Sequence, residues 1–166
     1  MDISIRSMNE NDWPSVSEIY RQGIKTGKAT FQSDIPAYNE WDASHIQKCR
    51  FVAVHDGKVV GWTALSKVSS RCVYGGVAEV SIYIAEDYRG KGVGRKLLQH
   101  LIIESEKAGF WMLQSGIMED NTVSISLHEK CGFRQVGYRE RIGRDIHGKW
   151  RSTVLMEKRS EVAGVD

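Results

Sequence analysis

Cysteines are scarce in this 166-residue sequence, and their positions argue against both a disulfide framework and a metal centre. The three, Cys49, Cys72 and Cys131, are odd in number and widely spaced, unlike the paired cysteines of small secreted domains. No C-x-x-C pair and no cluster of His and Cys offers the ligands of a zinc site. We therefore expect three reduced thiols in a cytosolic protein that holds no metal.

Long apolar runs and a strong charge imbalance are missing as well. No stretch approaches the roughly 18 apolar residues of a membrane span, and the first six residues lack the apolar centre of a signal peptide. The formal net charge of +2 is too small to predict a nucleic-acid surface. Even the densest basic stretch, 139–151, interleaves its cations with other residues, which suits the solvated faces of two strands. We expect a soluble, cytoplasmic protein that binds neither a membrane nor nucleic acid.

Hydrophobic periodicity predicts an α/β fold in one domain. A chain of this length buries a sizeable core, and it contains no linker, internal repeat or low-complexity tract. We expect the domain to span residues 1–158 and the polar tail 159–166 to be frayed. Alternation predicts strands near 3–6, 51–54, 59–65, 77–84, 111–117, 133–142 and 150–156, and helical spacing predicts helices near 14–24, 39–49, 93–108 and 122–130.

The most informative segment is a glycine-rich turn that joins a predicted strand to the longest predicted helix. Glycine permits positive φ and close backbone approach, and free N–H groups at a helix start bind phosphates. The dinucleotide pattern G-x-G-x-x-G fails because Arg95 stands where the third glycine belongs, and no Gly-Lys pair is followed by the Ser or Thr of a P-loop. The pattern that fits is Arg-x-x-Gly-x-Gly at Arg89, Gly92 and Gly94. Taken alone, it could equally be a tight structural turn.

This pattern resembles the coenzyme A pyrophosphate loop of GNAT acetyltransferases, which reads Gln/Arg-x-x-Gly-x-Gly/Ala. Further segments fit in the same order, and they resemble the phosphinothricin acetyltransferase group, whose members acetylate amino acids such as methionine sulfoximine. These segments are Ala78–Ile84, Asn121–Phe133, His147–Trp150 and, near the start, Ile19-Tyr20 with Ala29-Thr30-Phe31. The resemblance implies a mixed, mostly antiparallel sheet of six or seven strands with helices on both faces. Two neighbouring strands would splay apart to admit the pantetheine arm of acetyl-CoA.

The resemblance also implies which residues bind acetyl-CoA. The arm would pair with the backbone of Ile82, Tyr83 and Ile84 as an added strand. The pyrophosphate would lie on Arg89, Gly90, Lys91, Gly92, Val93, Gly94 and Arg95. Asn121 and Ser124 would contact the arm. Lys130 would lie near the outer end of the cofactor as a point charge, or else be a solvated helix residue.

Acetyl transfer to an amine needs a base, a polarised carbonyl and a proton for the thiolate. The resemblance makes Glu79 the base, although an exposed strand glutamate or a salt-bridge partner is the alternative. A backbone N–H of the same strand, that of Tyr83 or Ile84, would polarise the carbonyl. Most GNAT enzymes carry a tyrosine where this chain has His128, so His128 is either the general acid or a structural residue. Cys131 at a helix end suits packing better than nucleophilic attack, which favours direct transfer.

Acceptor selection is the least determined part of the sequence. Arg71, Tyr74 and Lys67 could meet an anionic acceptor, Phe31 could wall the pocket, and Glu79 would face the amine. The Arg151-Ser152 pair departs from the acidic or polar residue that the group carries after its hairpin tryptophan. Relatives suggest a homodimer. The alternatives are an acetyltransferase for protein amino termini or polyamines, and a non-catalytic acetyl-CoA-binding module.

Overall fold

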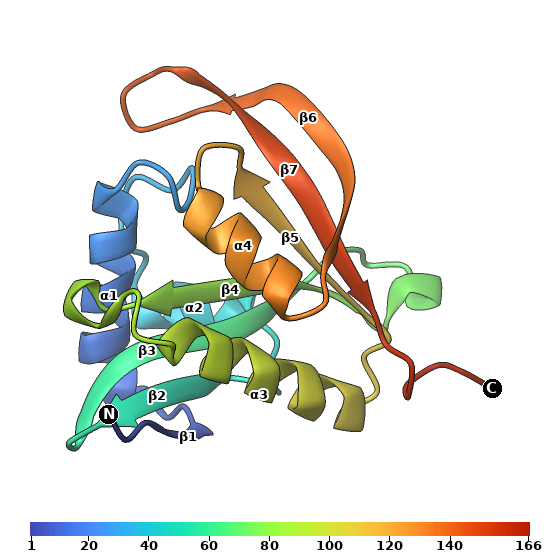
Figure 1. The fold of residues 1–166 in the computed structure, drawn as a ribbon, viewed down its shortest axis with the longest axis horizontal. Coiled ribbons are helices and arrows are strands. Elements are labelled where there is room, and N and C mark those ends of the chain that lie inside the picture. The colour runs from blue at the N-terminus through green and yellow to red at the C-terminus, as the bar shows by residue number, and fades with distance from the viewer.

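In the computed structural model, which describes residues 1–166, seven strands form one sheet in the order β1-β2-β3-β4-β5-β7-β6 (Figure 1). The strands are β1 (Ser4–Ser7), β2 (Phe51–His55), β3 (Lys58–Lys67), β4 (Val77–Ile84), β5 (Met112–Met118), β6 (Arg134–Arg144) and β7 (Trp150–Arg159). The helices are α1 (Trp13–Lys25), α2 (Tyr38–Ser44), α3 (Val93–Lys107) and α4 (Thr122–Lys130), with short 3₁₀ turns η1 (Glu10–Asp12), η2 (Cys72–Tyr74) and η3 (Glu86–Tyr88). Only β4 and β5 run parallel, so the predicted mixed, mostly antiparallel sheet is confirmed.

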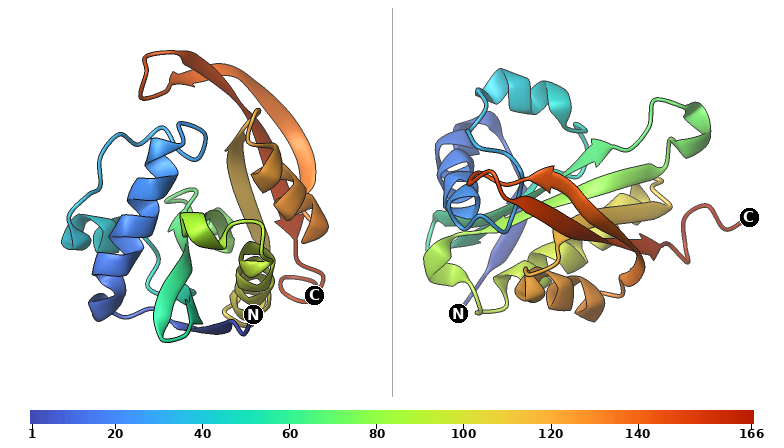
Figure 2. Two further views of the ribbon diagram at one scale, coloured as in Figure 1. Left: turned by 60° about the vertical axis from the view of Figure 1, so that its left-hand side comes forward. Right: turned by 90° about the horizontal axis from the view of Figure 1, so that it is seen from above.

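Helices cover both faces of the sheet, and each face has its own core (Figure 2). Alternation along β3 sends Trp62 and Ala64 toward α1 and α2, whereas Leu65 faces α3. The α3 core is the larger, with 16 buried residues against 8 on the α1 face. Apart from Val60, which lies at the β2–β3 bulge and joins the α3 core, the parity of a β3 residue therefore decides which face of the sheet its side chain occupies.

The parallel pair β4–β5 is short, and this shortness creates the site. The two strands pair only where Val77, Ala78 and Glu79 lie opposite Met112, Leu113 and Gln114. Beyond that point each strand is held by its outer neighbour, since β4 pairs with β3 as far as Ile84 and β5 pairs with β7 as far as Met118. The predicted splayed pair is thus confirmed, and the inner edge of β4 after Glu79 has no strand partner.

The helix predicted at 39–49 is wrong in length, because α2 ends at Ser44. His45 leaves the helix with extended backbone angles of φ −119° and ψ 149°. The buried guanidinium of Arg50 donates hydrogen bonds of 2.8–3.0 Å to the carbonyl oxygens of Asp42, His45 and Ile46. A longer helix would have used these carbonyls in its own backbone hydrogen bonds. Cys49 adopts a positive φ of 62°, which also excludes a helix.

The carboxyl end stays packed further along the chain than its polarity suggests. The hairpin strand β7 runs to Arg159 instead of Met156, and Ser160 and Ala163 are buried. Arg159 donates hydrogen bonds to the carbonyls of Ala163 (2.9 Å) and Gly164 (2.5 Å), and the Ser160 hydroxyl donates to Glu106. These bonds hold residues 160–164 against the body, in contrast to the frayed tail expected from residue 159. None of the helices has the length and apolar character that a membrane crossing requires.

Candidate active site

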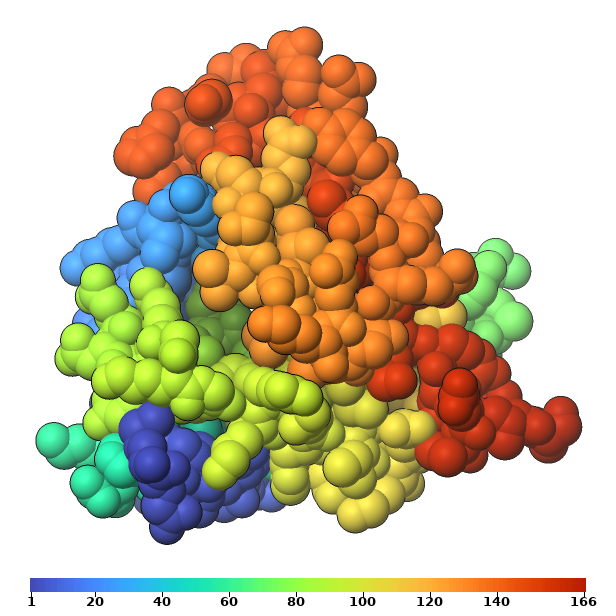
Figure 3. Space-filling model, in the orientation of Figure 1, coloured from blue at the N-terminus to red at the C-terminus, as the bar shows by residue number.

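A cavity of about 250 Å³ opens where β4 and β5 diverge. The space-filling view shows the surface hollowed between the segment around η3 and the start of α4 (Figure 3). Its lining comes from the loop after α1, from the end of β3, from the diverging strands β4 and β5, and from α4 with its N-cap. The lining residues are Lys28, Ala29, Thr30, Phe31, Ser66, Glu79, Val80, Ser81, Ile82, Tyr83, Ser115, Gly116, Ile117, Met118, Asn121, Ser124 and His128.

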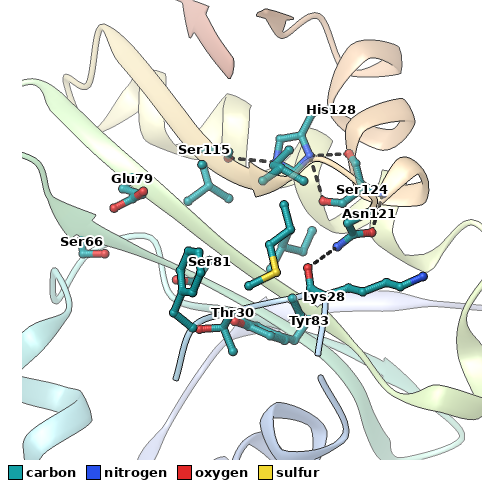
Figure 4. Close-up of a pocket in the computed structure, with 17 residues that line it drawn as sticks. Lys28, Thr30, Ser66, Glu79, Ser81, Tyr83, Ser115, Asn121, Ser124 and His128 are labelled. Carbon is teal, nitrogen blue, oxygen red and sulfur yellow. Dashed lines mark hydrogen bonds between the residues drawn. The ribbon is translucent and has the colours of Figure 1, made fainter. Parts of the chain in front are cut away.

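Strand parity divides this lining between the two faces of the sheet. Glu79, Ser81 and Tyr83 alternate with core residues of the α3 face, so they project toward α1. Ser115 shares its parity with Leu113 and Ile117 of the α3 core, so it projects toward α3 and α4. The cavity therefore passes through the split sheet and presents different chemistry at its two ends (Figure 4).

Glu79 is the free carboxylate of the α1 side. It is the last β4 residue paired with β5, it is half-buried, and its carboxylate has no ion-pair or hydrogen-bond partner. A Cβ placed on Gly116 would come within 3.9 Å of its Oε1 atom, so that glycine keeps the space beside the carboxylate open. An unpaired carboxylate that faces a cavity can accept a proton from a bound ligand.

Ser115 and His128 form a buried pair on the α4 side. The Ser115 hydroxyl lies 2.9 Å from His128 Nε2, and His128 Nδ1 lies 2.7 Å from the Ser124 carbonyl oxygen. Because a carbonyl only accepts, Nδ1 carries the proton, and Nε2 accepts the hydrogen bond that Ser115 donates. Burial lowers the pKa of His128 below its ordinary value, partly offset by the Ser124 carbonyl, which favours the neutral ring at neutral pH.

Ser115 was not among the predicted site residues, although the sequence carries a signal for it. It occupies a buried position of strand 111–117, in register with Leu113 and Ile117, where an apolar residue is expected. A serine in that register needs a polar partner, and only the fold brings His128 to it.

The glycine-rich turn has the geometry of an anion site at the start of α3. Gly90 and Gly92 have φ of 72° and 83°, and Gly92 is the N-cap residue of the helix. The amides of the first helical turn have no intrahelical acceptor, and the helix dipole favours negative charge there. Gly94 allows close packing, because a Cβ there would lie 3.2 Å from Leu127 of α4. These features fit the pyrophosphate of coenzyme A.

Aromatic side chains support the α1 side of the cavity. The Tyr83 ring stacks on Trp62 at 4.9 Å and contacts Tyr20 at 4.9 Å. A Cβ on Gly23 would come within 2.6 Å of the Tyr83 ring, so this glycine makes room for that ring within α1, which continues to Lys25. Burial strongly raises the pKa of the Tyr83 hydroxyl, which therefore remains protonated.

The loop after α1 is fixed by two residues from distant segments. Asn121 accepts a hydrogen bond from the Ser124 amide as the N-cap of α4 and donates to the Lys28 carbonyl at 3.2 Å. Arg151 donates to the Gly27 carbonyl at 2.9 Å. Asn121 thus has a structural role, as N-cap and loop contact, in addition to its predicted position beside the cofactor arm.

The structure brings some predicted residues together and leaves others apart. Phe31, Glu79, Ile82, Tyr83, Asn121, Ser124 and His128 line the one cavity, whereas Ile84 and residues 89–95 are not part of its lining. Arg71 and Tyr74 do not line it, since they lie exposed in and beside η2, with the guanidinium 5.6 Å from the tyrosine ring. Lys130 is exposed at the other end of α4. Burial raises the pKa of the Cys131 thiol despite nearby Arg95 and Lys158, which disfavours a nucleophilic thiolate.

Comparison with known proteins gives a consistent picture. The family model described as "Acetyltransferase (GNAT) family" matches residues 12–133. A phosphinothricin N-acetyltransferase of Alcaligenes faecalis is 34% identical over 161 residues, which cover 93% of this chain and 81% of the relative. An L-methionine sulfoximine/L-methionine sulfone acetyltransferase of Pseudomonas paraeruginosa is 29% identical and covers 95% and 94% of the two chains. The structure of a GNAT superfamily phosphinothricin acetyltransferase from Sinorhizobium meliloti in complex with acetyl-CoA matches with a TM-score of 0.90 at 30% identity, covering 100% of this chain and 92% of that chain.

Proposed function

This chain belongs to the GNAT acetyltransferase family, and we propose that it acetylates the primary amine of a small amino-acid-like acceptor, such as phosphinothricin, methionine sulfoximine or methionine sulfone. The acetyl donor is acetyl-CoA, the co-substrate of this family. The observation that carries the proposal is the cavity through the split sheet, with the free Glu79 carboxylate on one face and the Ser115–His128 pair on the other.

The cofactor would enter from the α3–α4 side. We propose that the pyrophosphate binds the amides at the start of α3 and that the pantetheine arm pairs with the unpartnered edge of β4 at residues 82–84. This route ends at the point where β4 and β5 meet and would bring the thioester between Glu79 and Ser115. The acceptor would then approach from the α1 side, past Phe31 and Tyr83.

Glu79 would remove the proton that the attacking amine loses. The amine nitrogen then forms a bond to the acetyl carbonyl carbon. Of the two candidate amides, that of Tyr83 points toward Trp62 in the ladder with β3, so the amide of Ile84, on the unpartnered edge of β4, would stabilise the carbonyl oxygen. Direct attack requires no acyl-enzyme, in agreement with the raised pKa and the burial of Cys131. The tetrahedral intermediate collapses by breaking the carbon–sulfur bond, and coenzyme A leaves as a thiolate that must be protonated.

The Ser115–His128 pair would supply that proton. In this proposal Nε2 of the neutral His128 ring first takes up a proton from solvent; the resulting imidazolium donates that proton to the Ser115 oxygen while the Ser115 hydroxyl gives its own proton to the thiolate sulfur, which returns His128 to its neutral form. The lowered pKa of His128 makes its imidazolium form a stronger acid than a free histidine. The pair would therefore take the place of the tyrosine that most GNAT enzymes carry at this position.

The first experiment is a thiol-release assay with acetyl-CoA and a panel of amines. The panel contains phosphinothricin, methionine sulfoximine, methionine sulfone, common amino acids, spermidine and an amino-terminal peptide. We expect turnover with the sulfoximine, the sulfone or phosphinothricin. Turnover with only the peptide or spermidine would replace the acceptor class, and tight acetyl-CoA binding without any turnover would favour a non-catalytic binding module.

We further propose a cytoplasmic homodimer. The three thiols are unpaired, as a reducing compartment leaves them, and the β6–β7 hairpin exposes Tyr138, Ile142 and Trp150. Arg71 would reach an anionic acceptor only from a second copy, since it does not line the cavity of its own chain. Light scattering after size exclusion tests the dimer, and a monomer at assay concentration would contradict it.

A further inference from the structure

The loop between α1 and α2 forms a wall of the cavity without secondary structure of its own. Residues Lys28, Ala29, Thr30 and Phe31 all line the cavity. Short side-chain bonds, such as Lys28 N–H to the Thr26 hydroxyl at 3.1 Å, shape the loop locally but do not attach it to the sheet. Its position relative to Glu79 must therefore come from contacts with other parts of the chain.

Arg151 of β7 makes such a contact from 124 positions away in the sequence. Its Nη1 atom donates to the Gly27 carbonyl at 2.9 Å and to Asp145 Oδ2 at 3.1 Å, and Nη2 pairs with Asp120. The Arg151 side chain is only 12% exposed, and that of Asp145 is 4% exposed. One planar guanidinium thus joins the loop after α1, the hairpin turn and the β5–α4 turn.

The Asp145 carboxylate is itself fixed before it receives Arg151. Its Oδ1 atom accepts from the amides of His147 and Lys149 at 2.9 and 3.0 Å, which closes the hairpin turn. Figures 1 and 2 show the tip of this hairpin reaching over the loop that follows α1. The hairpin turn therefore fixes the position of the Arg151 guanidinium, and the guanidinium in turn fixes the Gly27 carbonyl.

The same hairpin also receives the loop's aromatic side chain. A Cβ on Gly143 of β6 would come within 3.1 Å of the Phe31 ring, so the ring lies directly against that glycine. The loop is then held at Gly27 by Arg151, at Lys28 by Asn121 and at Phe31 by the β6 surface. Thr30 and Phe31, which face the acceptor side of the cavity, lie within this supported stretch.

We propose that Arg151 is a positioning residue for the acceptor, acting through the loop 26–31 and without touching the reacting atoms. This inference rests on the proposed function, because it assigns the α1 side of the cavity to the acceptor. It gives a role to the residue by which this chain departs from its group's pattern. Ser152 has a separate role, since its hydroxyl accepts a hydrogen bond from the Arg141 amide, where β6 bulges at a φ of 49°.

The kinetic test compares Arg151→Ala with Arg134→Ala as a matched control. Arg134 lies on the same hairpin and makes one exposed ion pair, with Glu157 at 3.0 Å, away from the cavity. We expect Arg151→Ala to raise the acceptor KM about tenfold or more, because a misplaced wall misorients the acceptor. The KM for acetyl-CoA should stay within about twofold, since the cofactor enters from the other face. The control should change neither constant.

Limited trypsin digestion gives a readout that does not need activity. Lys25 and Lys28 flank the point where Arg151 holds the loop. We expect cleavage after Lys28 to accelerate in Arg151→Ala, with the cut sites identified by mass spectrometry, while the remaining sites keep their wild-type rates. Arg151→Ala should also lower the melting temperature, because Asp145 and Asp120 lose their partner. Arg151→Lys should restore the melting temperature but not the acceptor KM, because one ammonium cannot bridge all three segments.

A folded Arg151→Ala protein with wild-type acceptor KM and wild-type cleavage at Lys28 would overturn the proposal, as would equal increases in both KM values. If Arg151→Ala does not fold, Asp120→Asn is the second variant. It removes the charge of an Arg151 partner whose side chain is 48% exposed, and it should raise the acceptor KM by a smaller factor. An unchanged acceptor KM in that variant then counts against the proposal. A wild-type enzyme that acetylates none of the acceptors would refute the proposed function, whereas the digestion would still decide whether Arg151 holds the loop.

Discussion

Single side chains in this molecule acquire a role from the face of the sheet on which they lie. Glu79 lies on the α1 face with a carboxylate that no other group binds. We expect Glu79→Gln to lower kcat about a hundredfold to a thousandfold, because the attacking amine loses its base. Acetyl-CoA affinity measured by calorimetry should be unchanged. The control is Glu86→Gln, in the exposed η3 turn beyond the same strand, which should leave kcat unchanged. An unaltered kcat for Glu79→Gln would show that another group is the base.

Ser115 is the side chain through which His128 would act on the leaving group. We expect Ser115→Ala to lower kcat about tenfold or more without raising either KM, because removing the hydroxyl interrupts the path to the sulfur. Ser105→Ala removes an equally buried serine whose hydroxyl bonds the Ile102 carbonyl inside α3, and should leave kcat unchanged. Equal losses in the two variants would mean that packing, and not proton supply, explains the effect.

At the scale of the element, the start of α3 differs chemically from its end although both carry a glycine at positive φ. Gly92 has φ of 83° and Gly109 has φ of 92°, and nothing would touch a Cβ at either position. Valine at either site should therefore cost a similar backbone strain, about 1–3 kcal/mol. We expect only Gly92→Val to abolish acetyl-CoA binding, because only that end presents free amides to the pyrophosphate. Calorimetric titration of both variants checks this, and equal affinities would refute the loop assignment.

The whole molecule should lose stability in two steps as the pH falls. Burial lowers the pKa of His45 and of His128, so below about pH 6.5 the unfolded chain binds protons that the folded chain does not. Stability then decreases as the pH falls, by at most about 1.4 kcal/mol per pH unit for each histidine. Asp12 and Asp145 have lowered pKa values through their arginine and backbone partners, which outweigh the effect of burial, so their contribution is lost only below about pH 4.

Thermal melts between pH 8 and pH 3 test this profile. The melting temperature should begin to fall near pH 6.5 and fall more steeply below pH 4. His128→Gln keeps a polar side chain and should flatten the first step relative to wild type, whereas the second step should remain. A melting temperature that rises between pH 6.5 and pH 5 would show that the buried rings are charged in the folded protein.

The sequence by itself determined the order of strands and helices, the glycine turn before α3 and the place of Glu79 on β4. These features depend on near neighbours, because a strand alternates every second residue and a helix start needs only its own first turn. The family resemblance added the splayed strands, which no local pattern could show, and the structure confirmed them.

Only the tertiary structure decided which distant groups meet. In the folded chain α2 ends early, and the Arg50 guanidinium binds a carbonyl near the end of that helix. Ser115 bonds His128, and Arg151 bonds the loop after α1. Arg71 does not line the cavity. Each of these outcomes pairs groups from different elements, where periodicity carries no information about the partner. A buried polar group must find its partner somewhere, but the fold alone selects which one.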